Sequence, residues 1–272
     1  MNHQEDDKLN TLLHYMSGAE PFSKTLRDLI RNRKQWCPFT HEDVGIDNDC
    51  YHANPFVQTV IAYIEKYAIC IRYLDCNDYA VADIECACRD LAVPERMSSL
   101  ADFDSHMNRV KVGVSFVEAD VSDKLGRFTC LECERLDEAI ECLKNYCFYA
   151  SVIMAVSAVE ARITEIVRRH DQSLYDSSFA KATLGQLVLL FDENHYREPE
   201  FANLKKLIPG KHKPLVALLN QYRVFSVHPK AEKITMQIAD AILKLSFTFM
   251  IDPATCPYGK EELKCTLEGA NL

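Results

Sequence analysis

Apolar residues recur every three or four positions through most of the C-terminal half of the chain, which is the spacing of an amphipathic helix. One such run predicts a long helix from about Glu132 to His170. Further runs predict helices over 183–194, 213–226 and 231–251. Four amphipathic helices within about 120 residues, one of them very long, predict a helical bundle.

The N-terminal half has a less regular pattern. Helical spacing predicts helices over 21–36 and 56–74, whereas 79–91 fits either a helix or a strand. Residues 109–116 read RVKVGVSF, and this alternation predicts a strand. The polar, turn-rich segment 37–55 predicts a loop.

These patterns together predict a mainly α fold. We expect a mostly helical N-terminal region with a few strands over 1–125, for which the sequence suggests no role. A helical bundle is expected over 126–255, and a C-terminal tail over 256–272.

The composition is that of a soluble globular protein, with 48% hydrophobic and 26% charged residues among 272. The net charge of −9 argues against a general nucleic-acid coat. The polar N-terminal stretch MNHQEDDKLN lacks the pattern of a signal peptide. The most apolar run, Tyr146–Val159, is shorter than the roughly 20 residues of a membrane span. We therefore expect a cytoplasmic protein with no membrane association and with reduced cysteines.

A carboxylate, Glu160, stands at an inner position of the predicted long helix. A lone carboxylate in an apolar core costs several kcal/mol unless it is paired, solvated or protonated. Either the site opens and leaves Glu160 in water, or a cation from a neighbouring helix meets it. Arg223, among apolar residues of the helix predicted over 213–226, is the best candidate, because arginine suits a bidentate carboxylate pair.

His228 precedes Pro229, and the residue before a proline is disfavoured in the helical conformation. The helix should therefore end near Val227, and Pro229 is expected to open the next helix. His228 would lie at a partly exposed elbow, where an imidazole can give and take protons near neutral pH. The alternative is a histidine that only caps the helix end.

Basic residues gather around this elbow. Between 201 and 235 the chain has seven Lys or Arg and one acid, Glu232, a local charge of +6. The basic residues are Lys205, Lys206, Lys211, Lys213, Arg223, Lys230 and Lys233. Such a cluster favours an anionic partner, usually phosphate, although a solvated basic face has the same composition.

The helix with an inner glutamate and the later R-x4-H motif resemble the HEPN superfamily over about residues 131–251. The matching segments are AIECLKNYCFYASVIMAVSAVEARITEIV, TLGQLVLLFDE and LLNQYRVFSVHPKAEKITMQIADAILKL. The resemblance implies a helical bundle, usually a homodimer, that in many members is a metal-independent RNA endonuclease. It places the catalytic roles on Arg223 and His228. It also implies settings such as toxin–antitoxin pairs, with an antitoxin as protein partner, phage defence or RNA processing.

The residues themselves add to this hypothesis. Glu160 is expected to orient Arg223, and Lys205, Lys206, Lys211, Lys213 and Lys230 are expected to contact RNA. We expect no cofactor. The alternative is a HEPN-like module without catalysis that binds or assembles through a protein or RNA partner.

Two groups of possible zinc ligands lie in the N-terminal half and at the start of the bundle, and neither has the spacing of a standard zinc finger. They are Cys37, His41, Cys50 and His52, and Cys86, Cys88, Cys130 and Cys133. The chain has no G-x-G-x-x-G, P-loop, G-x-S-x-G or H-E-x-x-H motif. Their absence argues against a nucleotide-dependent enzyme.

Overall fold

The computed structural model describes residues 12, 22–32, 56–62, 72–75, 78–92, 99–190, 192, 194–228 and 233–259. The predicted loop over 37–55, with its Cys and His residues, lies outside this part, as do Pro229 and Lys230. All regular elements in the described part are helices, which confirms the mainly α fold. The chain divides into two compact units, one of Met1–Asn10 with Gly18–Asp123 and one of Thr11–Ser17 with Lys124–Leu272.

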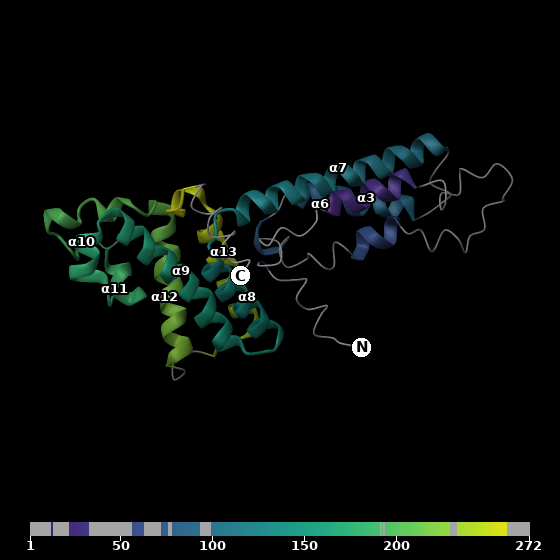
Figure 1. Cartoon of the computed structure of the whole chain (residues 1–272). Helices are drawn as coiled ribbons and strands as arrows, with labels where there is room; N and C mark the ends of the chain where they lie inside the picture. The colour runs from purple at the N-terminus through teal and green to yellow at the C-terminus, as the bar shows by residue number, and fades with distance from the viewer. Residues whose placement is uncertain are drawn as a thin grey trace, which may run out of the picture. The chain divides into compact units, whose positions relative to one another are not determined.

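Three helices of the first unit have well-defined bounds: α3 (Phe22–Arg31), α6 (Asp78–Leu91) and α7 (Leu100–Leu125), whose last two residues belong to the second unit (Figure 1). Residues 56–62 are also helical. The N-terminal amides of α3 are capped from α7, because the Glu118 carboxylate accepts hydrogen bonds from the Phe22 and Ser23 N–H groups. Such a carboxylate satisfies amides that have no partner inside the helix.

The predicted strand over 109–116 is wrong, because these residues lie in the middle of α7. Val110 and Val114 are buried one turn apart, whereas Val112 and Phe116 are 53% and 67% exposed. The burial period is therefore that of a helix, and it continues beyond the eight alternating residues. The ambiguous segment 79–91 is also helical, within α6.

In its described residues, the second unit has five longer helices and several short turns of helix. The longer helices are α8 (Cys130–Lys144), α9 (Phe148–His170), α11 (Leu184–Leu189), α12 (Lys213–Val227) and α13 (Met236–Ile251). The short elements are α10 (Gln172–Leu174), a π turn Tyr175–Phe179, and 3-10 turns at Pro199–Phe201, Leu204–Lys206, Gly210–His212 and Pro253–Thr255. Helix α9 is the central element, since it packs against α8, α12 and α13 (Figure 1).

The predicted continuous helix over 132–170 is wrong, because α8 and α9 are separated by a turn at 145–147. The Asn145 side chain donates to the Glu141 carbonyl at 2.8 Å, and Tyr146 has a positive φ of 61°. The two helices pack against each other, with the buried Ser151 hydroxyl donating to the Ala139 carbonyl at 2.8 Å. The break does not interrupt the apolar pattern, because both helices bury one face in the same core.

The bounds of the remaining helices differ in detail from the predicted ones. Helix α12 ends at Val227, as expected, whereas α11 ends at Leu189, five residues before the predicted end. Helix α13 begins at Met236 with Thr235 as its N-cap, so the prediction that Pro229 opens it is wrong. No helix in the described part of the chain is long and apolar enough to span a membrane.

Candidate active site

Glu160 of α9 and Arg223 of α12 face each other, as the sequence predicts. One carboxylate oxygen of Glu160 accepts the Leu184 N–H at 2.5 Å, and the other lies 3.9 Å from Arg223 Nη1. Each side chain is 25% exposed, so the pair lies at the edge of the apolar core. At 3.9 Å the ion pair is loose, and its contribution to stability is small. Glu160 therefore anchors the first turn of α11 and lies beside the Arg223 guanidinium without a hydrogen bond to it.

The guanidinium of Arg223 has few hydrogen bonds. Its Nη2 donates to Asn220 Oδ1 at 3.4 Å, and its buried Nε has no acceptor among the described residues. An arginine has five N–H donors in a planar fork. Among the described residues, most Nη donors of Arg223 therefore lack a close acceptor, whereas the unsatisfied Nε is buried and out of reach of a bound anion.

His228 lies at the end of α12 with its side chain exposed. It is the C-cap residue, but the capping bond comes from its backbone N–H, which donates to the Val224 carbonyl at 2.9 Å. The imidazole takes no part in this bond, so capping does not account for the histidine side chain. An exposed imidazole at a helix end is free to exchange protons with a ligand.

Arg223 lies within α12, whereas His228 lies just beyond it. His228 is the C-cap residue, with a non-helical φ of −121° and ψ of 75°. The regular rotation of the helix therefore does not continue to His228.

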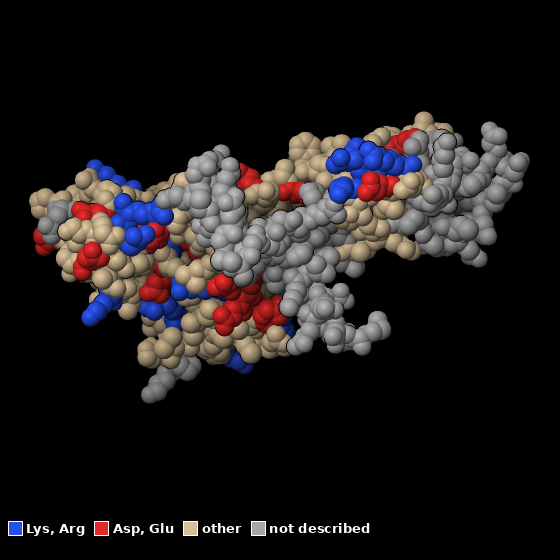
Figure 2. All heavy atoms as spheres, viewed as in Figure 1, with Lys and Arg blue, Asp and Glu red and all other residues tan. Residues whose placement is uncertain are grey.

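The basic residues around the elbow are less available than their number suggests. Lys205 donates to the His195 carbonyl at 2.8 Å, and Lys211 pairs with Asp252. Lys206 is exposed and Lys213 is half-buried at the first residue of α12. Blue and red side chains adjoin on the face shown in Figure 2, so the described residues form no continuous basic surface there. Folding therefore brings an acid from a distant part of the sequence, Asp252, to Lys211.

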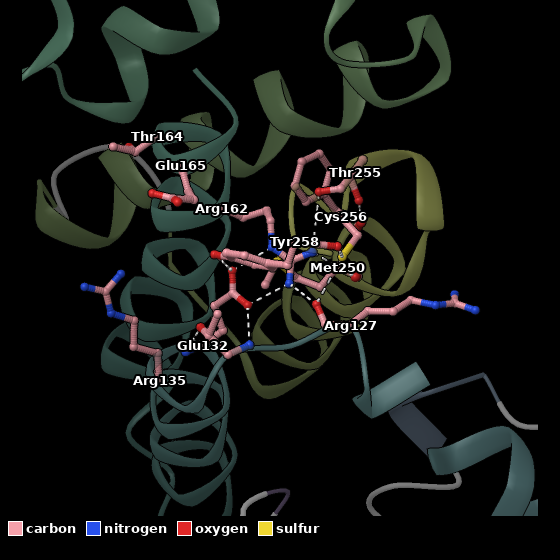
Figure 3. A network of polar contacts seen from close by, with 12 residues as sticks. Arg127, Glu132, Arg135, Arg162, Thr164, Glu165, Met250, Thr255, Cys256 and Tyr258 are labelled. Carbon is pink, nitrogen blue, oxygen red and sulfur yellow. Dashed lines mark hydrogen bonds and ion pairs between the residues drawn. The ribbon is translucent and has the colours of Figure 1, made fainter. Parts of the chain in front are cut away.

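A second arginine, Arg162 of α9, forms a buried network that the sequence pattern does not reveal (Figure 3). Arg162 is fully buried and Glu132 of α8 is 1% exposed. Two parallel hydrogen bonds of 2.6 Å join them, from Nε and Nη2 to the two carboxylate oxygens. Three carbonyls accept the remaining N–H groups, at 2.7 Å on Arg127, 3.3 Å on Met250 and 3.4 Å on Thr255.

Side chains from both ends of the second unit complete this network. Glu132 forms a capping box with Thr129 at the start of α8. The Tyr258 hydroxyl donates to Glu132 at 3.3 Å, and the Arg162 guanidinium lies 5.3 Å from the centre of the Tyr258 ring. Burial raises the pKa of Tyr258 above its usual range. Tyr258, assigned from the sequence to a C-terminal tail, is therefore part of the packed unit.

The charge state of Arg162 follows from these contacts. Burial alone would lower the pKa of the guanidinium, but the hydrogen bonds and charge of Glu132 outweigh burial and raise it. All five donors of Arg162 are used inside the protein. We therefore assign Arg162 a structural role.

A buried histidine, His212, forms another cluster, where the turn before α12 meets the end of α13. His212 is 4% exposed, and its Nε2 lies 2.9 Å from Asp252 Oδ2. Burial would raise the pKa of Asp252, but hydrogen bonds from Lys211, the Ala254 N–H and His212 outweigh burial and hold it well below its usual value. The cluster joins the turn before α12 to the end of α13.

In comparisons with protein-family models, curated proteins and solved structures, no match to this chain was found. Among the described residues no three His, Cys, Asp or Glu side chains gather as metal ligands, and these residues include Cys86, Cys88, Cys130 and Cys133.

Proposed function

We propose that the second unit is a HEPN-like, metal-independent RNA endonuclease that uses Arg223 and His228. The observation that carries this proposal is the contrast between two arginines. Arg162 has all five donors occupied, whereas Arg223 makes two long contacts and has a buried Nε with no acceptor among the described residues. A half-buried guanidinium with free donors is suited to bind a phosphate.

RNA supplies the nucleophile for this reaction. The 2′-hydroxyl attacks the adjacent phosphorus, its proton passes to a base, and the 5′-oxygen leaves as it gains a proton. The exposed His228 imidazole is suited to either proton transfer, and Arg223 to the charge on the phosphoryl oxygens. The products are a 2′,3′-cyclic phosphate and a 5′-hydroxyl, and Glu160 contributes by orienting Arg223.

The position of His228 outside α12 supports a site shared between two copies of the chain. His228 is the exposed C-cap residue, whereas Arg223 lies within the helix beside Glu160, so one phosphate can be reached by Arg223 of one copy and His228 of another. We therefore propose a two-fold homodimer in which each copy completes the site of the other.

Cleavage of varied RNAs in EDTA tests the proposed activity. We expect cyclic-phosphate products, with activity about 10²–10³-fold lower in Arg223→Ala and about 10²–10⁴-fold lower in His228→Ala. The matched controls His195→Ala and Arg197→Ala change a half-exposed histidine and an exposed arginine of the same unit. Loss of cleavage in EDTA, or equal cleavage by wild type and both site variants, would refute the proposal.

Mixing the two site variants tests the shared site. In a dimer with shared sites, co-expressed Arg223→Ala and His228→Ala chains form mixed dimers with one intact site each. Random pairing then restores about one quarter of wild-type activity. Absence of any recovery, with dimers present by light scattering, contradicts the shared arrangement.

A non-catalytic binding module is the second candidate, and apolar side chains beside the site favour it. Val224, Val227 and Met236 are 42%, 55% and 51% exposed. Exposed apolar residues that cluster are typical of protein interfaces. This candidate predicts that Val227→Asp disrupts a protein complex, measured by light scattering, while wild type cleaves no RNA.

A further inference from the structure

Two cysteines meet at the turn between α8 and α9. Helix α8 ends in a Schellman motif with Asn145 as its C-cap. The Cys147 N–H donates to the Cys142 carbonyl at 2.8 Å. The Tyr146 N–H donates to the Leu143 carbonyl at 3.2 Å, which is the second bond of the motif. The side chains of the first and last residues of this motif commonly touch, and here both of these residues are cysteines.

The hydrogen bond between the two cysteines places their backbones within the range of a disulfide. Standard bond lengths and the 2.8 Å contact limit the separation of the Cys142 and Cys147 Cα atoms to at most about 6.7 Å. Disulfides join residues whose Cα atoms are about 4.4–6.8 Å apart. In the structure both cysteines are free thiols. The position of the backbone therefore permits a disulfide in this turn.

The two thiols differ in their surroundings. Cys147 is exposed, and its Sγ lies 3.5 Å from the Asn145 carbonyl oxygen. Cys142 is half-buried, and burial, together with the nearby charges of Glu138 and Cys147, raises the pKa of its thiol. A charge on Cys147 has this effect because the two sulfur atoms lie close together. An exposed cysteine beside a second cysteine that can resolve it is typical of redox-sensing sites.

We propose that Cys142 and Cys147 form a reversible redox site, which a peroxide oxidises to an intramolecular disulfide. The Cys147 thiolate attacks one oxygen of hydrogen peroxide, the O–O bond breaks, and the departing hydroxide takes up a proton to form water. The Cys142 thiolate then attacks the sulfur of the Cys147 sulfenic acid. The S–S bond forms, the S–O bond breaks, and a second water leaves. The two thiols together lose two electrons and two protons, and dithiothreitol reverses the reaction.

The disulfide would replace a hydrogen-bonded helix cap by a covalent one at the turn that joins two core helices. In reducing compartments, disulfides that form transiently are usually catalytic or redox-sensing. The inference does not rest on the proposed ribonuclease function, because the proposed reaction uses neither thiol.

Peptide mapping of the full chain after peroxide treatment tests this proposal. Trypsin cuts after Lys144 and so separates the two cysteines into peptides 136–144 and 145–162, each with one cysteine. After dilute hydrogen peroxide and alkylation without reduction, we expect these two peptides as one linked species in mass spectrometry. Dithiothreitol added before alkylation should release them.

Single variants assign the two roles. Cys142→Ser should leave a sulfenic acid on Cys147 that dimedone traps, whereas Cys147→Ser should leave Cys142 reduced. Cys130→Ser is the matched control, because Cys130 is another half-buried cysteine of α8. It should yield the linked peptides as wild type does.

Equilibrium with glutathione distinguishes positioning by the fold from chance pairing along the chain. At a fixed ratio of reduced to oxidised glutathione, the ratio of linked to reduced peptides should be at least about ten-fold higher in native buffer than in urea, because the cap holds the thiols together. This measurement uses the wild-type chain, so it does not depend on the folding of a variant. The proposal is overturned if no linked peptide forms or if the ratios in native buffer and urea are equal. Oxidised Cys147 found mainly in disulfides between two chains also overturns it.

Discussion

Replacement of Arg162 by methionine should strongly destabilise the second unit. The change removes all five donors from a fully buried site and leaves the Glu132 carboxylate, 1% exposed, with only the Thr129 N–H and the Tyr258 hydroxyl. Removing one member of a buried ion pair costs about 3–5 kcal/mol. Three carbonyls also lose a donor, which adds about 1–3 kcal/mol. The sum approaches the total stability of a typical domain, about 5–15 kcal/mol.

The second perturbation, Glu132→Gln, separates the ion pair from the helix cap. Glutamine at this position preserves a capping box with Thr129, so the variant loses mainly the charge that pairs with Arg162. The double variant removes both charges and should be more stable than Arg162→Met alone. We expect the loss of stability in the double variant to be about 2–3 kcal/mol smaller than the sum of the losses from Arg162→Met and Glu132→Gln.

The assay is urea unfolding followed by circular dichroism. Hydrogen exchange of peptides from α8 and α9 locates the loss in the second unit, since two units need not unfold together. Arg168→Met is the matched control: Arg168 lies on the same helix, but it is 42% exposed and pairs with Glu165 at 2.6 Å. We expect a loss below about 1 kcal/mol there. The reasoning is refuted if Arg162→Met lowers the free energy of unfolding by less than about 1 kcal/mol. It is also refuted if the loss of stability in the double variant equals the sum of the losses in the two single variants.

Three further predictions concern other parts of the chain. Gly113→Ala should destabilise the first unit by about 1–3 kcal/mol in urea unfolding, because an added Cβ would lie 2.6 Å from Ile84 Cγ1. The double variant Gly113→Ala with Ile84→Ala should recover part of this loss, because the smaller side chain removes the clash. Because the pKa of Asp252 is lowered in the folded protein, its hydrogen bonds stabilise the fold fully above about pH 4 and less as acid protonates the carboxylate. The difference in free energy of unfolding between wild type and Asp252→Asn should therefore become smaller from pH 7 to pH 3. A difference that stays constant contradicts this prediction. Burial raises the pKa of Cys88 to about 12, so iodoacetamide at pH 8 should alkylate exposed Cys147 well before Cys88, as mapped by mass spectrometry.

Local patterns predict the helices better than they predict the turns. The apolar period identifies α9, α12 and α13 because each buries one face, and it predicts the meeting of Glu160 and Arg223 because both break an apolar face. The turn at Tyr146 is not predicted, since its left-handed backbone needs neither glycine nor proline to form. The strand expected over 109–116 is wrong because eight alternating residues are too few to distinguish the two periods when valines fit both.

The Arg162 network lies beyond such local reasoning. Thr129 and Glu132 have the spacing of a capping box, but the acceptors of Arg162 lie 30 to 93 residues away in sequence. Nothing local indicates that Arg162 is buried while Arg168, six residues on, is exposed. Long-range contacts decide which charge a helix turns inward.

Helix α9 combines these two kinds of charged residue on opposite sides. Glu160 and Arg162 are two residues apart, so their side chains point about 160° away from each other. On one side, the saturated Arg162 contacts fix α9 to α8 and to the end of α13. On the other, Glu160 accepts the Leu184 N–H in the first turn of α11 and lies 3.9 Å from Arg223. The proposed phosphate site would depend on this arrangement, because the Arg162 network fixes the helix from which Glu160 faces the incompletely bonded Arg223.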